Sequence, residues 1–140
     1  MASLAQLRAE HRELEKLAAQ LLRVVVADVP DRALVAGMRW QIARALHTHC
    51  ASEDEMLRAW LLASSDAAAG AAMRRYAEAE LDLCEAFGRY IADWPLARMG
   101  QEWVAFRAAT LAIAAKLADR ISLEEQLLYP HVERLERRAA

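Results

Sequence analysis

Apolar residues recur every three or four positions through four long segments of this chain, and this spacing constrains its fold more than any other feature. In the first segment Leu7, Leu14 and Leu21 lie on one face of a helix. Only 4 glycines and 3 prolines occur among 140 residues, which leaves little material for hairpins or long loops. The pattern predicts an all-α protein.

Short breaks separate the four helical segments. In chain order they fall at Val29-Pro30, at Ser64-Ser65-Asp66, at Trp94-Pro95 with a loop that includes Gly100, and at Pro130. Ser3 and Asp31 stand where the first two helices need N-caps. The tail from His131 to Ala140 is expected to continue as one more turn or two. Because each apolar stripe must find a partner, residues 1–140 are predicted to form a single domain, an up-down-up-down four-helix bundle.

A short motif occurs once in each half of the chain. His49-Cys50-Ala51-Ser52-Glu53 in the second segment corresponds to Arg120-Ile121-Ser122-Leu123-Glu124 in the fourth. On a helix, positions i and i+4 lie on the same face, so His49 and Glu53 can reach one metal ion. Arg120 carries only hydrogen-bond donors and a permanent charge, and therefore cannot replace a histidine ligand.

Polar residues interrupt the apolar stripe of every segment. They are His11, His49, Glu53, Glu80, Arg120 and Glu124. His11 and His49 lie about equally far from the Pro30 turn, so antiparallel packing brings them to one level. Buried carboxylates need compensating cations. Three glutamates and one arginine leave an excess of two negative charges, which one divalent metal ion would neutralise; two metal ions with a bridging oxide would balance the charge equally well.

With His11, His49-xxx-Glu53 and xxx-Glu124-Glu125 leading into Leu128-Tyr129-Pro130, the chain resembles the hemerythrin-like, or HHE cation-binding, family over nearly its whole length. The resemblance implies a four-helix bundle with a non-haem diiron site, used in oxygen binding, iron handling, or redox and nitric oxide responses. It also implies that His11, His49, Glu53 and Glu124 are ligands, with the two glutamates as bridges.

Two departures from the family pattern reduce the number of metal ligands expected in the site. Arg120 replaces the second-half histidine, and the third segment has no histidine, with Glu80 or Tyr76 as the nearest inward candidates. Arg120 is expected to replace a lost second cation by pairing with Glu80 or Glu124. Loss of imidazole ligands should weaken the binding of a second ion. We therefore expect a mononuclear metal site on His11, His49, Glu53 and Glu124, with Glu80 as a further ligand, holding iron first and zinc or manganese as alternatives.

Three functions fit these residues. The first is a metal-binding or sensing protein with the reduced site. The second is an oxidoreductase-like diiron or dimanganese centre acting on oxygen or peroxide, in which Glu80 or Tyr76 replaces the missing histidines. The third is a metal-free scaffold with a buried Arg120 and glutamate network. The residues leave open whether the protein is an enzyme.

Partners and location follow from charge and from the cysteines. The net charge of -2 is mixed along the chain, without a basic stripe, so nucleic acid is not expected. No signal peptide or membrane span is apparent, and Cys50 and Cys84, far apart in sequence, fit reduced thiols in the cytoplasm. The expected partner is a metal ion, with a small diatomic ligand and a homodimer left open, and no membrane.

Overall fold

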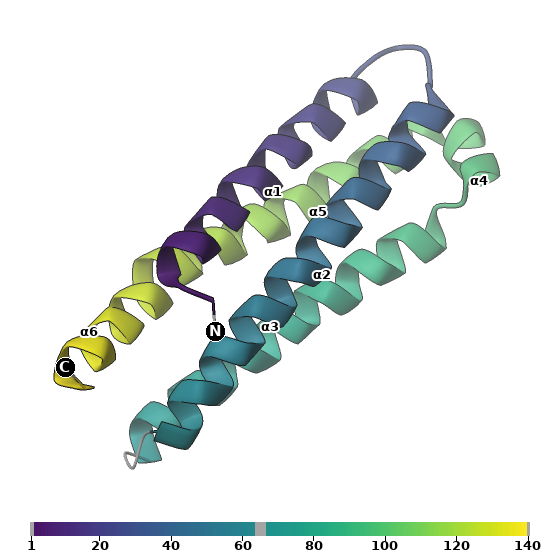
Figure 1. Cartoon of the computed structure of the whole chain (residues 1–140). Coiled ribbons are helices and arrows are strands. Elements are labelled where there is room, and N and C mark those ends of the chain that lie inside the picture. Colours follow the sequence, from purple (N-terminus) through teal and green to yellow (C-terminus); the bar gives the residue numbers. More distant parts are fainter. Residues whose placement is uncertain (1, 64–66, 140) are drawn as a thin grey trace.

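The computed structural model describes residues 2–63 and 67–139, and nearly all of them are helical (Figure 1). The elements, in order, are α1 (Leu4–Val25), α2 (Arg32–Ala63), α3 (Ala67–Asp93), α4 (Leu96–Gln101), α5 (Trp103–Leu123), the π-helix η1 (Glu124–Leu128) and α6 (Tyr129–Ala139). The predicted all-α class is confirmed, and no strand occurs within these two described ranges.

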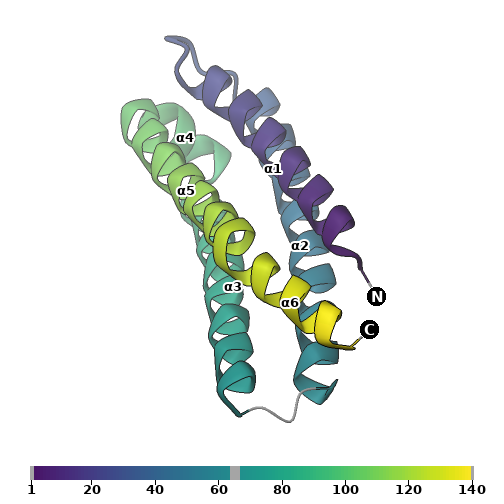
Figure 2. The same ribbon diagram turned by 90° about the vertical axis from the view of Figure 1, so that its left-hand side faces the viewer.

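Four long rods form the bundle. Helix α1 contacts α2 and α5, and α3 contacts α2 and α5, so the four close into a ring (Figures 1 and 2). The start of α1 and the C-terminal α6 lie at one end, while α4 and the connection between α1 and α2 lie at the other (Figure 1). The up-down-up-down arrangement is therefore the one that the apolar periodicity predicts.

Both predicted N-caps are present. The Oγ atom of Ser3 accepts a hydrogen bond of 3.1 Å from the backbone N–H of Gln6. The Oδ1 atom of Asp31 accepts one of 3.1 Å from the N–H of Leu34. Each cap satisfies an otherwise free donor of the first turn, worth about 1 kcal/mol.

The predicted break at Trp94-Pro95 is confirmed, but two details of the predicted breaks are wrong. Gly100 belongs to the short helix α4 instead of a loop, and Pro130 is the second residue of α6 instead of a stop. Immediately before it, the N–H of Tyr129 donates to the carbonyl of Glu124, five residues back, so the turn is wider than in an α-helix. Proline lacks an N–H and clashes with the carbonyl four residues earlier. A widened turn accommodates that ring, and the rod continues.

The apolar core is divided in two by a polar layer. One cluster includes Leu14, Leu46 and Ile121, and the other, nearer the start of α1, includes Leu7 and Met56. Between them lie six buried polar residues: His11, His49, Glu53, Glu80, Arg120 and Glu124. Burying a leucine such as Leu7 or Leu14 stabilises the fold by roughly 2 kcal/mol. Because these leucines flank His11 on one stripe, their burial turns His11 inward.

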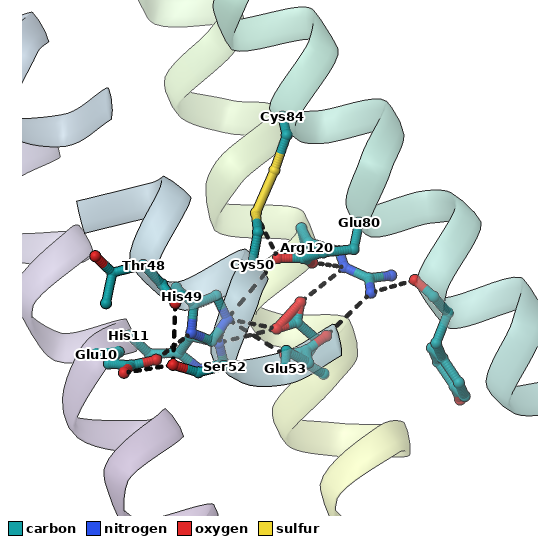
Figure 3. The surroundings of a disulfide bond; sticks show 12 residues. Glu10, His11, Thr48, His49, Cys50, Ser52, Glu53, Glu80, Cys84 and Arg120 are labelled. Atoms are coloured by element: carbon teal, nitrogen blue, oxygen red, sulfur yellow. Dashed lines mark hydrogen bonds and ion pairs between the residues drawn. A yellow bond between two sulfur atoms is a disulfide. The ribbon is translucent and has the colours of Figure 1, made fainter. Parts of the chain in front are cut away.

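The expectation of reduced, separate cysteines is wrong in this structure. Cys50 of α2 and Cys84 of α3 form a disulfide (Figure 3). The two positions are 34 residues apart in sequence, but antiparallel packing of α2 and α3 brings them to the same level. The residue spacing alone does not reveal this pairing. Among the described residues, no helix combines the length and apolarity needed to cross a membrane.

Candidate metal centre

Four side chains from three elements converge in the polar layer. They are His11 from α1, His49 and Glu53 from α2, and Glu124 from η1, and all four are buried. Each offers one ligand atom, and these atoms lie within 4.8 Å of one another. The four residues that the motif and the inward stripes predict as ligands therefore share one site.

The separations of the ligand atoms match the dimensions of a metal site. The Nε2 atoms of His11 and His49 are 3.1 Å apart, and each is 3.0 Å from Oε1 of Glu124. Oε2 of Glu53 is 3.3 Å from Nε2 of His49. Metal–ligand bonds of about 2.0–2.2 Å place neighbouring ligand atoms roughly 3 to 3.6 Å apart. The donor set thus fits one ion held by two imidazoles and two carboxylates.

Each histidine has a carboxylate behind it. Nδ1 of His49 lies 2.9 Å from Oε1 of Glu10, and Nδ1 of His11 lies 3.3 Å from Oε1 of Glu125. Arg12 in turn donates to Glu125 at 2.6 Å. A carboxylate that accepts the Nδ1 proton leaves Nε2 free to ligate, which is the usual support of a metal-bound histidine. No pattern in the sequence predicted such a role for Glu10 or Glu125.

Tyr129 is a site residue that the sequence analysis missed. Its hydroxyl donates to Oε2 of Glu53 at 3.1 Å and lies 3.1 Å from Nε2 of His11. In a regular α-helix, residues five positions apart diverge by about 140° around the axis. The π-helix between Glu124 and Tyr129 removes much of that divergence, so both side chains face the site. The signal available in the sequence was the proline at position 130, directly after this tyrosine.

Arg120 lies on the opposite side of the same carboxylates. Its Nε atom is 2.7 Å from Oε2 of Glu124 and 2.9 Å from Oε2 of Glu80. Its Nη2 atom is 3.4 Å from Oε1 of Glu53 (Figure 3). Arg120 was expected to pair with Glu80 or Glu124, and it pairs with both. Glu53 and Glu124 each direct one oxygen to the histidines and the other to the guanidinium, as a carboxylate would bridge two cations.

Glu80 and Tyr76 take different places from the four clustered residues. Oε1 of Glu80 lies 4.0 Å from Nε2 of His49, and the same oxygen lies 3.1 Å from the disulfide-bonded Sγ of Cys50. Tyr76 contributes its backbone carbonyl, which accepts from Nη2 of Arg120 at 2.7 Å. Glu80 is therefore the inward carboxylate of α3, and its nearest cation is Arg120.

Without metal, the cluster holds extra protons. Burial disfavours the His49 cation, but hydrogen bonds and attraction from Glu124 and Glu53 outweigh it and raise the pKa of His49 to about 11. Burial and the hydrogen bond with Glu124 raise the pKa of Glu53 to about 7. Burial opposes ionisation of Glu124, yet hydrogen bonds from Glu53, His11 and His49 hold its pKa below the ordinary value. Burial also raises the pKa of Tyr129, which keeps its hydroxyl a donor.

Comparison with known proteins agrees with this geometry. The family model described as the hemerythrin HHE cation-binding domain matches residues 2–132. No curated protein and no solved structure matches the chain. The match covers nearly the whole bundle, including all four clustered residues. The chain belongs to the hemerythrin HHE cation-binding domain family.

Proposed function

We propose that this protein binds one non-haem metal ion, iron foremost, through His11, His49, Glu53 and Glu124. The observation that carries the proposal is the convergence of their four ligand atoms within 4.8 Å in a buried layer. Two imidazoles and two carboxylates suit iron, and they also suit zinc and manganese. The hydrogen bond between Glu10 and Nδ1 of His49 supports the same reading, because it orients Nε2 of His49 inward. Glu125 places a carboxylate oxygen 3.3 Å from Nδ1 of His11.

A single ion, and not two, is favoured by Arg120. Its guanidinium lies between the outer oxygens of Glu53, Glu80 and Glu124, where it supplies a fixed positive charge. A second metal ion would have to compete with that charge for the same oxygens. Glu80, the fifth ligand candidate from the sequence, then acts by holding Arg120 in place.

The proposed role is binding or sensing in the cytoplasm. A bound iron supplies a centre that can change oxidation state and take a small ligand such as a diatomic molecule. The chain itself supplies buried surroundings and the Tyr129 hydroxyl, a hydrogen-bond donor beside the ligand atoms of His11 and Glu53.

The test is metal content per chain. Protein purified without a histidine tag is analysed by elemental mass spectrometry, and its absorption spectrum is recorded in air. About one iron, zinc or manganese ion per chain is expected. Two irons per chain with charge-transfer bands would replace the proposal with a diiron centre. No bound metal after incubation with iron, zinc and manganese would replace it with a metal-free scaffold.

A further inference from the structure

A second group of metal-ligand types lies beside the histidine cluster. It consists of Cys50 on α2 with Glu80 and Cys84 on α3, whose ligand atoms also lie within 4.8 Å of one another (Figure 3). Glu80 and Cys84 are one helical turn apart and share a face of α3. Glu80 is buried, and both cysteines are half-buried.

Glu80 is already oriented toward the sulfurs. Its Oε1 atom lies 3.1 Å from the disulfide-bonded Sγ of Cys50, while its Oε2 atom accepts a hydrogen bond from Nε of Arg120 at 2.9 Å. Arg120 therefore anchors one oxygen and leaves the other facing the two cysteines. A carboxylate held in this way is a third ligand that needs no rearrangement.

The backbone spacing also suits a bridging ion. The Cα atoms of Cys50 and Cys84 are 7.5 Å apart. Most disulfides join Cα atoms about 4.4–6.8 Å apart. A zinc ion with Zn–S bonds of about 2.3 Å holds its two sulfurs roughly 3.8 Å apart, and so accommodates a wider backbone separation.

A groove between α2 and α3 gives access to these sulfurs. Its volume is about 530 Å³, and its lining includes Cys50, Cys84 and Glu80 together with His47 and Leu81. The same opening admits a reductant and an ion. It also leaves a fourth coordination position for water or another small ligand.

We propose that reduction of the Cys50–Cys84 disulfide creates a second metal site, for a thiophilic divalent cation such as Zn²⁺, on Cys50, Glu80 and Cys84. A dithiol reductant supplies two electrons and two protons, becomes a disulfide itself, and leaves two protein thiols. Zn²⁺ then displaces both thiol protons and binds two thiolates and one carboxylate. Cytoplasmic thiol systems favour the reduced form, so the site would be available there.

The charges of this arrangement balance. Two thiolates and Glu80 bring three negative charges, and Zn²⁺ with the neighbouring Arg120 guanidinium brings three positive ones. Two thiolates favour Zn²⁺ over the harder cations that prefer oxygen ligands only. The site therefore differs in ligand type from the histidine and carboxylate cluster.

Cobalt(II) titration tests the site, because thiolate-to-cobalt charge-transfer absorption reports sulfur ligands only. Wild-type protein is reduced with a phosphine, which takes up the oxygen of water as the disulfide becomes two thiols, and is then titrated anaerobically with Co²⁺. We expect the thiolate band to saturate at about one Co²⁺ per chain and to disappear when Zn²⁺ is added. Oxidised protein, with no free thiols by thiol titration, should show no band.

Variants separate this site from the histidine cluster. Cys84→Ser should abolish the two-thiolate band, and Glu80→Gln should weaken Co²⁺ binding about tenfold or more. Glu78→Gln, a change of an exposed acid that lines the same groove, should leave it unchanged. His49→Ala should keep the band even though it disables the first site. Absence of the band in reduced wild-type protein, or an undiminished band in Cys84→Ser, would overturn the proposal regardless of what the histidine cluster binds.

Discussion

Arg120 and Glu124 lie one helical turn apart, and Nε of Arg120 is 2.7 Å from Oε2 of Glu124. In the other copy of the motif, the same spacing places Nε2 of His49 at 3.3 Å from Oε2 of Glu53. The His49 unit therefore pairs its carboxylate with an imidazole that can lose its proton. The Arg120 unit pairs its carboxylate with a permanent cation. This difference is the physical reason for which we propose one metal ion in place of two.

Arg120→His should raise metal content from about one ion per chain toward two. The change removes the fixed cation and restores an imidazole beside Glu80 and Glu124. Elemental mass spectrometry after dialysis measures the stoichiometry. Arg39→His is the control, because Arg39 is also buried but stacks on Tyr90 and Phe106, outside the polar layer. Unchanged metal stoichiometry in Arg120→His would argue against the proposal that Arg120 takes the place of a second metal ion.

His49→Ala should remove the stabilisation that metal confers on the fold. A ligand present at a hundred times its Kd adds about 2.7 kcal/mol to the free energy of unfolding, and loss of a central ligand should abolish most of that gain. Thermal unfolding with metal and with chelator measures it as a difference in Tm. His47→Ala changes an exposed histidine on the same helix and should retain the full metal-dependent shift. A shift of normal size in His49→Ala would mean that metal binds elsewhere.

Tyr129→Phe should weaken metal binding by about tenfold and lower the free energy of unfolding by roughly 1 to 3 kcal/mol. The hydroxyl serves both His11 and Glu53, so its loss leaves buried polar atoms with fewer partners. Competition with a chromogenic chelator gives the metal affinity. Tyr90→Phe is the matched control, because the Tyr90 hydroxyl is also buried but forms its hydrogen bond with Thr110, beside the other core cluster. That variant should lose stability without losing affinity; equal affinity losses in both would point to general loosening.

The metal-free protein should become less stable as pH rises from about 6 to 8, while the stabilisation by metal should grow. The folded-state pKa of His49 is raised from 6.5 to about 11, so its contribution is fully present below 6.5 and is lost as pH rises toward 11. The pKa of Glu53 is raised from 4.5 to about 7, so its contribution to folding stability is present below pH 4.5 and is lost as the pH rises through about 7. The lowered pKa of Glu124 acts in the opposite sense, but only below 4.5.

The measurement is Tm with and without chelator across that pH range. Metal ligation requires neutral His49 and ionised Glu53, so metal competes with the protons that the metal-free cluster retains. The gap between the two Tm values should therefore widen with pH. A gap that stays constant, or narrows, would show that these two groups do not exchange protons for metal.

Much of the candidate site followed from local regularities of the chain. The 3.6-residue period of the apolar stripes determined four helices, and it also determined that His11, His49, Glu53 and Glu124 point inward, since each interrupts such a stripe. Ser3 and Asp31 were readable as caps because capping is a contact within one turn.

Other contacts were decided only by the tertiary structure. They depend on how one helix is rotated and shifted along its neighbour. The Cys50–Cys84 pair needs the level of α3 against α2, and the carboxylates of Glu10 and Glu125 reach histidines on a neighbouring helix. Tyr129 faces the site because η1 departs from the α-helical period on which sequence analysis relies. Local periodicity therefore determined which polar residues point into the candidate site, and packing between helices determined which other groups contact them.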